Sequence, residues 1–523
     1  MRVKEASLAK GANLSEKRNL RELRLHLDSP WSAGGGDEDE LLVFEALRPY
    51  TNLQRLSIKG FGGVEFPAWL SNGSDLPNLK TLLLRSMANL KEWLVGDGVM
   101  FPCLEELLIK DCPNLSKTPE HMFPSLKSLK LENVGGMGVV SITSSLTSLT
   151  SFIIAGCKGL EFLQEGLVSN NSQLNTVLIR NCPKLQAFRE EGLASAAADE
   201  ILPNRFLCCI DESDFYFESE GISIRDCPEL ESLGKGFLSS LVFLESLDVG
   251  NYGKLKYIEL SQSLTELRKL CFDNCGNLRQ LPSKEQMLQL TSPNELTIRG
   301  CPAISSIDLP TLPSLLELEI YNCPTISSID LSTLPSLREL SIYFCRPISS
   351  IDLPTLPSLR ELKITYCEGL QGLQGLQFLT ALKELRLGPF SEELNDFPFA
   401  LESNNPLILP SLRQLSIDGW AALQSLPHQL QRLTTLKSLC ICNFSQLTEL
   451  PEWLGNLTSL EELRIYWCGN LRHLPSKEQM HRLTFLKTLY IYDCPRLKER
   501  CSREWEGDDP EWPKISHITF LYL

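Results

Sequence analysis

The amino-acid sequence predicts an α/β solenoid, a fold in which one short structural unit is stacked many times along an axis. Two internal duplications indicate it. The segment CPAISSIDLPTLPSLLELEIYN, which starts at Cys301, recurs in modified form at Cys323 and Cys345, giving a period of 22 residues. Residues 275–291 and 468–484 are related as well, with 14 of 17 positions identical. A fixed period of this length is typical of solenoid proteins.

The repeating unit reduces to Leu-x-x-Leu-x-Ile/Leu-x-x-Cys, often continued by Pro-x-Leu, which is the leucine-rich-repeat signature. Clear copies begin at Leu104, Leu126, Leu149, Leu174, Leu244, Leu267, Leu315, Leu337, Leu359, Leu382, Leu412, Leu436, Leu460 and Leu486. Weaker copies begin at Leu20, Leu53, Leu79, Ser219, Pro293 and Ile515. We therefore expect a leucine-rich-repeat horseshoe of about 20 repeats, with residues 1–523 forming a single solenoid.

Apolar and polar residues alternate inside each unit, which predicts one short strand per repeat. In the copy that begins at Leu337, Leu340 and Ile342 would face the core, while Ser341 and Tyr343 face solvent. Stacked units would place these strands side by side in a parallel sheet on the concave face. The remaining 13 to 17 residues of a 22- to 26-residue period leave little room for a long helix. We expect mostly extended or 3-10 segments on the convex face.

Cysteines recur at the ninth position of the unit, where leucine-rich repeats take a small buried residue. Eleven of the 18 cysteines are there: Cys112, Cys157, Cys182, Cys227, Cys275, Cys301, Cys323, Cys345, Cys367, Cys468 and Cys494. One cysteine per turn does not resemble the paired Cys-x-x-Cys spacing of a zinc site. Stacking brings the cysteines of adjacent turns close together, but it does not direct their side chains toward each other as a disulfide requires. We interpret these residues as structural thiols and expect no metal.

The register of the repeats is interrupted in three places. Residues 28–40 are rich in glycine and acids and predict a flexible acidic loop. Residues 186–220 lack a clear unit and are either a degenerate repeat or an insertion, and residues 388–409 lengthen one period and predict a surface loop. Residues 494–523 are interpreted as a C-terminal closing repeat.

Composition and motifs exclude several functions. Fifty Lys and Arg stand against 65 Asp and Glu, for a net charge of −15, which argues against a nucleic-acid partner. The N-terminal residues do not resemble a signal peptide, and the serine- and threonine-rich stretch 133–157 fits a soluble repeat, so we expect no membrane insertion. No phosphate loop, metalloprotease motif or nucleophile elbow occurs, and the six histidines are scattered. We expect a protein that is not an enzyme and needs no cofactor.

Three segments resemble a known family. NLRELRLHL at residues 19–27, VFEALRPYTNLQRLSIKGFGGVEFPAWL at residues 43–70 and CPRLKERCSREWEGDDPEWPKISHITFLYL at residues 494–523 are similar to the leucine-rich-repeat region of plant coiled-coil nucleotide-binding disease-resistance receptors. The coiled-coil segment and nucleotide-binding switch of those receptors are not found in this sequence. The resemblance implies a cytoplasmic immune module that recognises pathogen effectors, or host proteins that they modify, or that contacts a receptor's nucleotide-binding domain.

Aromatic residues at solvent-facing strand positions are the candidate protein-binding residues, because aromatic side chains are favoured as interface anchors. They are Tyr321, Tyr343, Tyr466, Trp467, Tyr490 and Tyr492. Aromatic side chains also stack across neighbouring strands, so a purely stabilising role stays open.

Other classes of leucine-rich-repeat protein fit less well. An F-box-type substrate adaptor needs an F-box, yet repeat-like sequence begins by Leu20. An extracellular receptor would carry Leu-x-Gly-x-Ile-Pro repeats and a signal peptide. A truncated, non-signalling decoy or regulator remains an alternative.

Overall fold

The computed structural model describes residues 6–27, 37–71, 75–93, 101–118, 123–164, 166–171, 173–189, 222–233, 238–239, 241–392, 394, 409–505 and 507–523. These residues form two compact units. The first unit contains the chain up to Lys269, and the second contains the chain from Ser292 onward, while short pieces between them are divided between the two units. Repeats of the predicted kind make up both units.

In the first unit, nine short strands pair in parallel, each with the next along the chain. They are β1 (Glu22–His26), β2 (Arg55–Lys59), β3 (Thr81–Arg85), β4 (Glu106–Cys112), β5 (Ser128–Val134), β6 (Ser151–Ala155), β8 (Thr176–Arg180), β10 (Ile222–Arg225) and β11 (Ser246–Gly250).

In the second unit, ten strands pair in the same way. They are β13 (Glu295–Arg299), β15 (Glu317–Tyr321), β17 (Glu339–Tyr343), β19 (Glu361–Thr365), β21 (Glu384–Leu387), β22 (Gln414–Asp418), β23 (Ser438–Cys442), β24 (Glu462–Tyr466), β25 (Thr488–Tyr492) and β26 (Phe520–Tyr522). Strand β12 (Lys269–Asp273) contributes residues to both units. Every predicted repeat thus has its strand among the described residues, so the parallel-strand solenoid is confirmed.

Alternation decides which side chains form the core. Leu340 and Ile342 of β17 have no exposed surface, whereas Ser341 and Tyr343 between and after them are half-buried on the other side. Because the strands pair in register, Leu340 lies beside the equivalent leucines of β15 and β19. The same pattern repeats along both units, so each repeat completes the core of the next.

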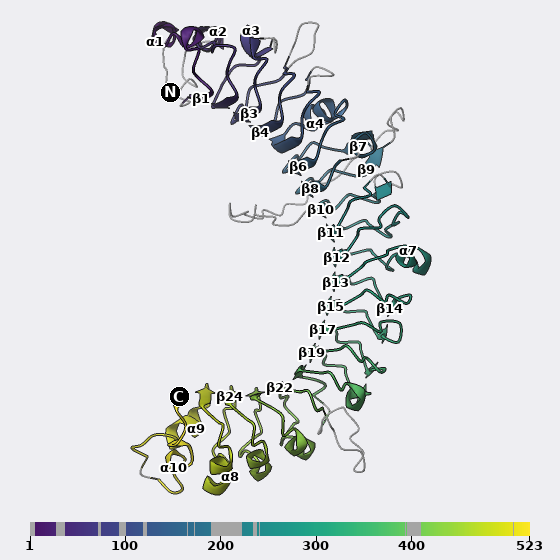
Figure 1. The fold of residues 1–523 in the computed structure, drawn as a ribbon, viewed down its shortest axis with the longest axis vertical. Coiled ribbons are helices and arrows are strands. Elements are labelled where there is room, and N and C mark those ends of the chain that lie inside the picture. Colours follow the sequence, from purple (N-terminus) through teal and green to yellow (C-terminus); the bar gives the residue numbers. More distant parts are fainter. Residues whose placement is uncertain are drawn as a thin grey trace. The chain divides into compact units, whose positions relative to one another are not determined.

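The segments opposite the strands are short. Three pairs of three-residue strands lie there: β7 (Phe162–Gln164) with β9 (Ala187–Arg189), β14 (Ser306–Asp308) with β16 (Ser328–Asp330), and β18 (Ser350–Asp352) with β20 (Gly372–Gln374). The 3-10 helices are η1 (Leu14–Glu16), η4 (Leu376–Phe378), η5 (His428–Arg432) and η6 (Glu452–Asn456). The α-helices are α1 (Ala6–Gly11), α2 (Asp37–Ala46), α3 (Ala68–Ser71), α4 (Gly136–Thr143), α5 (Gly166–Ser169), α7 (Lys284–Leu288), α8 (Lys477–Arg482), α9 (Pro495–Arg500) and α10 (Trp512–Ile515). Figure 1 shows α4, α7 and α8 on the side of their unit away from the principal strands. Little helix is present in the part of the chain that the structure describes, as predicted.

Most repeats turn after the strand through one residue in the left-handed backbone region. This residue precedes the ninth-position cysteine, and Asn322 (φ 51°) before Cys323 is an example. Hydrogen bonding between adjacent repeats continues into the turn, because the N–H of Asn322 donates to the carbonyl of Tyr343 in the next repeat, at 2.8 Å. The cysteine thiol then points inward and donates to the carbonyl two residues earlier, as Cys345 does to Tyr343 at 3.3 Å. All cysteines among the described residues are free thiols.

The interrupted segments lie partly outside the described residues. Of the predicted acidic loop 28–40, residues 37–40 belong to α2, consistent with the preference of acidic residues for a helix N-terminus. Residues 28–36, 190–221, 393 and 395–408 lie outside the description. Within the closing segment 494–523, β26 pairs with β25.

Candidate protein-binding surface

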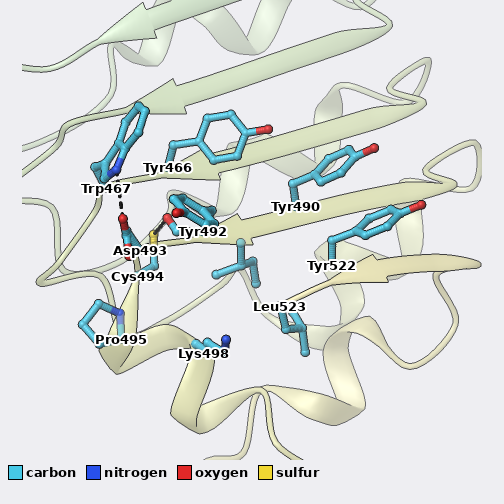
Figure 2. Close-up of a pocket in the computed structure, with 11 residues that line it drawn as sticks. Tyr466, Trp467, Tyr490, Tyr492, Asp493, Cys494, Pro495, Lys498, Tyr522 and Leu523 are labelled. Carbon is cyan, nitrogen blue, oxygen red and sulfur yellow. Dashed lines mark hydrogen bonds between the residues drawn. The ribbon is translucent and has the colours of Figure 1, made fainter.

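The last three strands and α9 form a pocket of about 750 Å³, which we call the C-terminal aromatic pocket. Five of its lining residues are aromatic: Tyr466, Trp467, Tyr490, Tyr492 and Tyr522. The remaining lining residues are Ile491, Asp493, Cys494, Pro495, Lys498 and Leu523. Figure 2 shows the aromatic rings together on one side of the strands, with Pro495 and Lys498 of α9 below them. Such a concentration of large, partly exposed rings is typical of a binding surface.

Strand register explains why these rings meet. Tyr466 of β24 lies opposite Tyr492 of β25, and Tyr490 of β25 lies opposite Tyr522 of β26. The Tyr490 and Tyr522 rings are stacked with centroids 4.5 Å apart. The guanidinium of Arg464 lies 5.6 Å from the Tyr490 centroid and pairs with Glu462 at 2.9 Å. Burial raises the pKa of the Tyr466 phenol, so this ring stays neutral at physiological pH.

Trp467 forms one edge of the pocket just after β24. Its ring meets those of Tyr466 and Tyr492 at centroid distances of 5.8 and 6.3 Å, and its indole N–H donates to Asp493 Oδ2 at 3.1 Å. Despite these contacts the side chain remains 51% exposed, and Tyr492 is 60% exposed. The rings are thus positioned by one another, while much of their surface is open to solvent.

A second aromatic group, the mid-array group, consists of Tyr321, Tyr343, Phe344 and Tyr366. Tyr321 and Tyr343 are register partners on β15 and β17 with centroids 6.3 Å apart. Phe344 meets Tyr321 edge-on at 5.4 Å and stacks on Tyr366 at 4.6 Å. The six predicted residues therefore fall into two groups, of which only the C-terminal one lines the pocket.

Three of these aromatic residues occupy the left-handed turn position. Phe344, Tyr366 and Trp467 have φ values of 55°, 56° and 53°. Most other repeats place Asn, Asp or Gly there, residues for which this conformation costs little. For a bulky side chain the cost is about 1–2 kcal/mol. Strain of this kind is often found at functional sites.

Sequence reasoning missed Tyr522, Phe344 and Tyr366. Tyr522 belongs to a weak repeat, and its position opposite Tyr490 depends on the pairing of β26 with β25. Phe344 and Tyr366 had a visible signal, because each precedes a ninth-position cysteine where neighbouring repeats have Asn or Asp.

A separate polar cluster joins the closing segment to the preceding repeats. Glu511, fully buried, accepts hydrogen bonds from the Leu474 N–H at 3.0 Å and Lys514 Nζ at 3.0 Å, and His473 Nδ1 lies 3.1 Å from it. His473, Asp509 and Glu511 bring their ligand atoms close enough to hold a metal ion. Because Lys514 already provides the positive charge, we interpret the cluster as an ion-pair network.

Fold and site together define a leucine-rich-repeat solenoid with an aromatic surface on its strand face. Parts of the chain are similar to the leucine-rich-repeat regions of plant disease-resistance proteins. The R13L1/DRL21 leucine-rich-repeat family model matches residues 1–112 and 429–494. The BspA-type leucine-rich-repeat region model matches residues 246–371.

Individual relatives are similar over parts of the chain. The chain is 29% identical over 225 residues to disease resistance protein RGA2 of Solanum bulbocastanum, covering 35% of this chain and 22% of that protein. It is 32% identical over 102 residues to disease resistance protein RPP8 of Arabidopsis thaliana, covering 19% and 11%. The matched part thus spans a fraction of these relatives' length. A leucine-rich-repeat protein structure from Leptospira interrogans aligns over 94% of this chain and 100% of its own, with 16% identity and a TM-score of 0.37. Among the described residues, no helix has the length and apolar content needed to cross a bilayer.

Proposed function

We propose that this chain is a non-catalytic recognition module of plant immunity, acting in the cytoplasm by binding a pathogen effector or a guarded host protein. The observation that carries the proposal is the C-terminal aromatic pocket. Strand register holds its rings in place, and three of them, Trp467, Tyr492 and Tyr522, are more than half exposed. Similarity to the repeats of disease-resistance proteins supplies the biological setting.

Energetics favour a binding role for Trp467 in particular. Replacing it with Asn would relieve about 1–2 kcal/mol of left-handed strain. It would also remove two ring contacts worth about 0.5–1.5 kcal/mol each. Since these terms nearly cancel, stability alone gives little reason for tryptophan at this position.

The Trp467→Asn variant is therefore expected to separate binding from stability. Its free energy of unfolding should stay within about 1 kcal/mol of the wild-type value. Its affinity for the partner should fall by about 2 kcal/mol or more, roughly 30-fold, as for an interface anchor. Urea titration measures the first quantity. Proximity labelling in leaves challenged with pathogen, followed by titration of the purified labelled protein, measures the second.

Phe485→Ala provides the matched control. Phe485 is 59% exposed, lies shortly before β25 in the sequence and does not line the pocket. Tyr490→Ala is a second pocket variant. Proteins that are labelled with wild type and with Phe485→Ala, but not with Trp467→Asn or Tyr490→Ala, would be partners that bind through the pocket. If all variants retain the same proteins with the same affinity, the pocket is not the binding surface. Retention of ubiquitin-ligase scaffold proteins would instead favour the substrate-adaptor alternative.

A further inference from the structure

Cys440 and Cys442 differ from the ninth-position cysteines, which we call the ladder cysteines. Strand β23 directs Leu439 and Ile441 into the core, so the two cysteines share the opposite, solvent-facing side of the strand. Their sulfur atoms are 3.2 Å apart. Cys440 is half-buried and Cys442 is 5% exposed.

The neighbouring strands supply polar and charged partners for Cys440. Ser416 of β22 and Arg464 of β24 are its register partners on either side. The hydrogen bond with Cys442 lowers the pKa of the Cys440 thiol, and Ser416 and Arg464 lower it further, against the opposing effect of burial. Arg464 is also paired with Glu462 at 2.9 Å, and Asp418 acts in the opposite direction, so the hydrogen bond with Cys442 is the main influence on Cys440. A partly exposed thiol with a lowered pKa is more reactive than a buried one.

Cys442 has the opposite environment. Its hydrogen bond with Cys440, and then burial, raise its pKa, and the buried Asp418 is its register partner on β22. Cys442 is also the last residue of β23 and is followed by Asn443 in the left-handed region, with φ 58°. The extended backbone of β23 therefore ends directly after Cys442.

We propose that Cys440 and Cys442 form an oxidation-sensitive dithiol on the strand face, in which Cys440 reacts with a hydroperoxide and Cys442 resolves the product. The Cys440 thiolate attacks one peroxide oxygen, the O–O bond breaks, and the departing oxygen takes up a proton and leaves as water or an alcohol. Cys440 becomes a sulfenic acid. Cys442 then loses its proton and attacks the Cys440 sulfur. The S–S bond forms, the S–O bond breaks, and the hydroxide takes up a proton and leaves as water.

The electrons balance across the two steps. The peroxide gains two electrons, and the two sulfur atoms lose them. A dithiol reductant returns both thiols by exchange.

Mass spectrometry of the folded chain treated with hydrogen peroxide tests this proposal. Cleavage after Lys437 and Arg464 releases residues 438–464, which contain these two cysteines and no others. We expect this peptide to lose two hydrogens, and to regain them with dithiothreitol. Cys440 should react faster than the exposed Cys103, because Cys442, Ser416 and Arg464 favour its thiolate form. Cys345, buried in the ladder, should stay reduced.

Two single variants separate the roles of the thiols. In Cys442→Ser, Cys440 should stop at the sulfenic acid and be trapped by a cyclic diketone. In Cys440→Ser, residues 438–464 should stay unmodified on the same timescale. Circular dichroism of each variant before treatment checks that it is folded. The proposal is overturned if Cys440 reacts no faster than Cys103, or if Cys442 is oxidised equally fast without Cys440.

Discussion

Replacing Glu511 with Gln is expected to weaken the C-terminal end of the array by about 3–5 kcal/mol, the range measured when one partner of a buried ion pair is removed. The Glu511 carboxylate is completely shielded from solvent and receives Lys514 at 3.0 Å, with Arg500 Nε 4.0 Å away. Glutamine preserves the shape but leaves Lys514 with only the exposed Asp509, 3.9 Å away, as an acidic partner. Because Glu511 also accepts from the Leu474 N–H, the loss should spread from the closing segment into the preceding repeat.

Amide hydrogen exchange gives the local readout for this prediction. Protection of Leu474 and of the β25–β26 pair should fall strongly in Glu511→Gln, while β13 to β19 keep theirs. Glu504→Gln is the control, since Glu504 is an exposed acid in the same segment. Equal protection in both variants would mean that the ion-pair network does not hold the closing segment.

High pH is expected to unfold the repeats that contain buried cysteines, among them the ninth-position cysteines and Cys501. Burial raises the pKa of Cys112, Cys323, Cys345 and Cys501 to about 12 and that of Cys367 to about 11. An unfolded thiol titrates near about 8.5. The folded chain therefore holds these protons to higher pH than the unfolded chain does. Stability is full below about pH 8.5 and falls as pH rises through the window up to about 12, by about 1.4 kcal/mol per pH unit for each thiol.

Urea titrations between pH 8 and 11 measure this slope. Cys345→Ala should reduce it by the contribution of one proton, at the cost of a small cavity at neutral pH. Cys103→Ala, which changes an exposed thiol, should leave it unchanged. An identical slope in wild type and Cys345→Ala would show that tyrosines and lysines, and not the ladder, account for alkaline unfolding.

The fold was predictable because every repeat has the same pattern of buried and exposed positions. The alternation around Leu340 and Ile342 appears some twenty times, so a weak local signal becomes a strong one. Even a weak copy, such as the unit that contains β10, has its strand paired in register with the strands on both sides. The candidate site was predictable only in part. The strand period predicts that Tyr466, Tyr490 and Tyr492 face solvent. Tyr522 joins the pocket only because β26, which belongs to a weak repeat, pairs with β25.

By itself, the sequence determined the repeat, the strand positions, the buried ninth-position cysteines and the resemblance to plant disease-resistance proteins, because all of these depend on local period and composition. Only the tertiary structure decided which side chains meet across strands or across segments distant in the chain. It joined Glu511 to Lys514 and Leu474, gathered five rings into one pocket and brought the Cys440 and Cys442 sulfurs into contact. Period fixes the face of a strand on which a residue lies. Packing and register fix its neighbours.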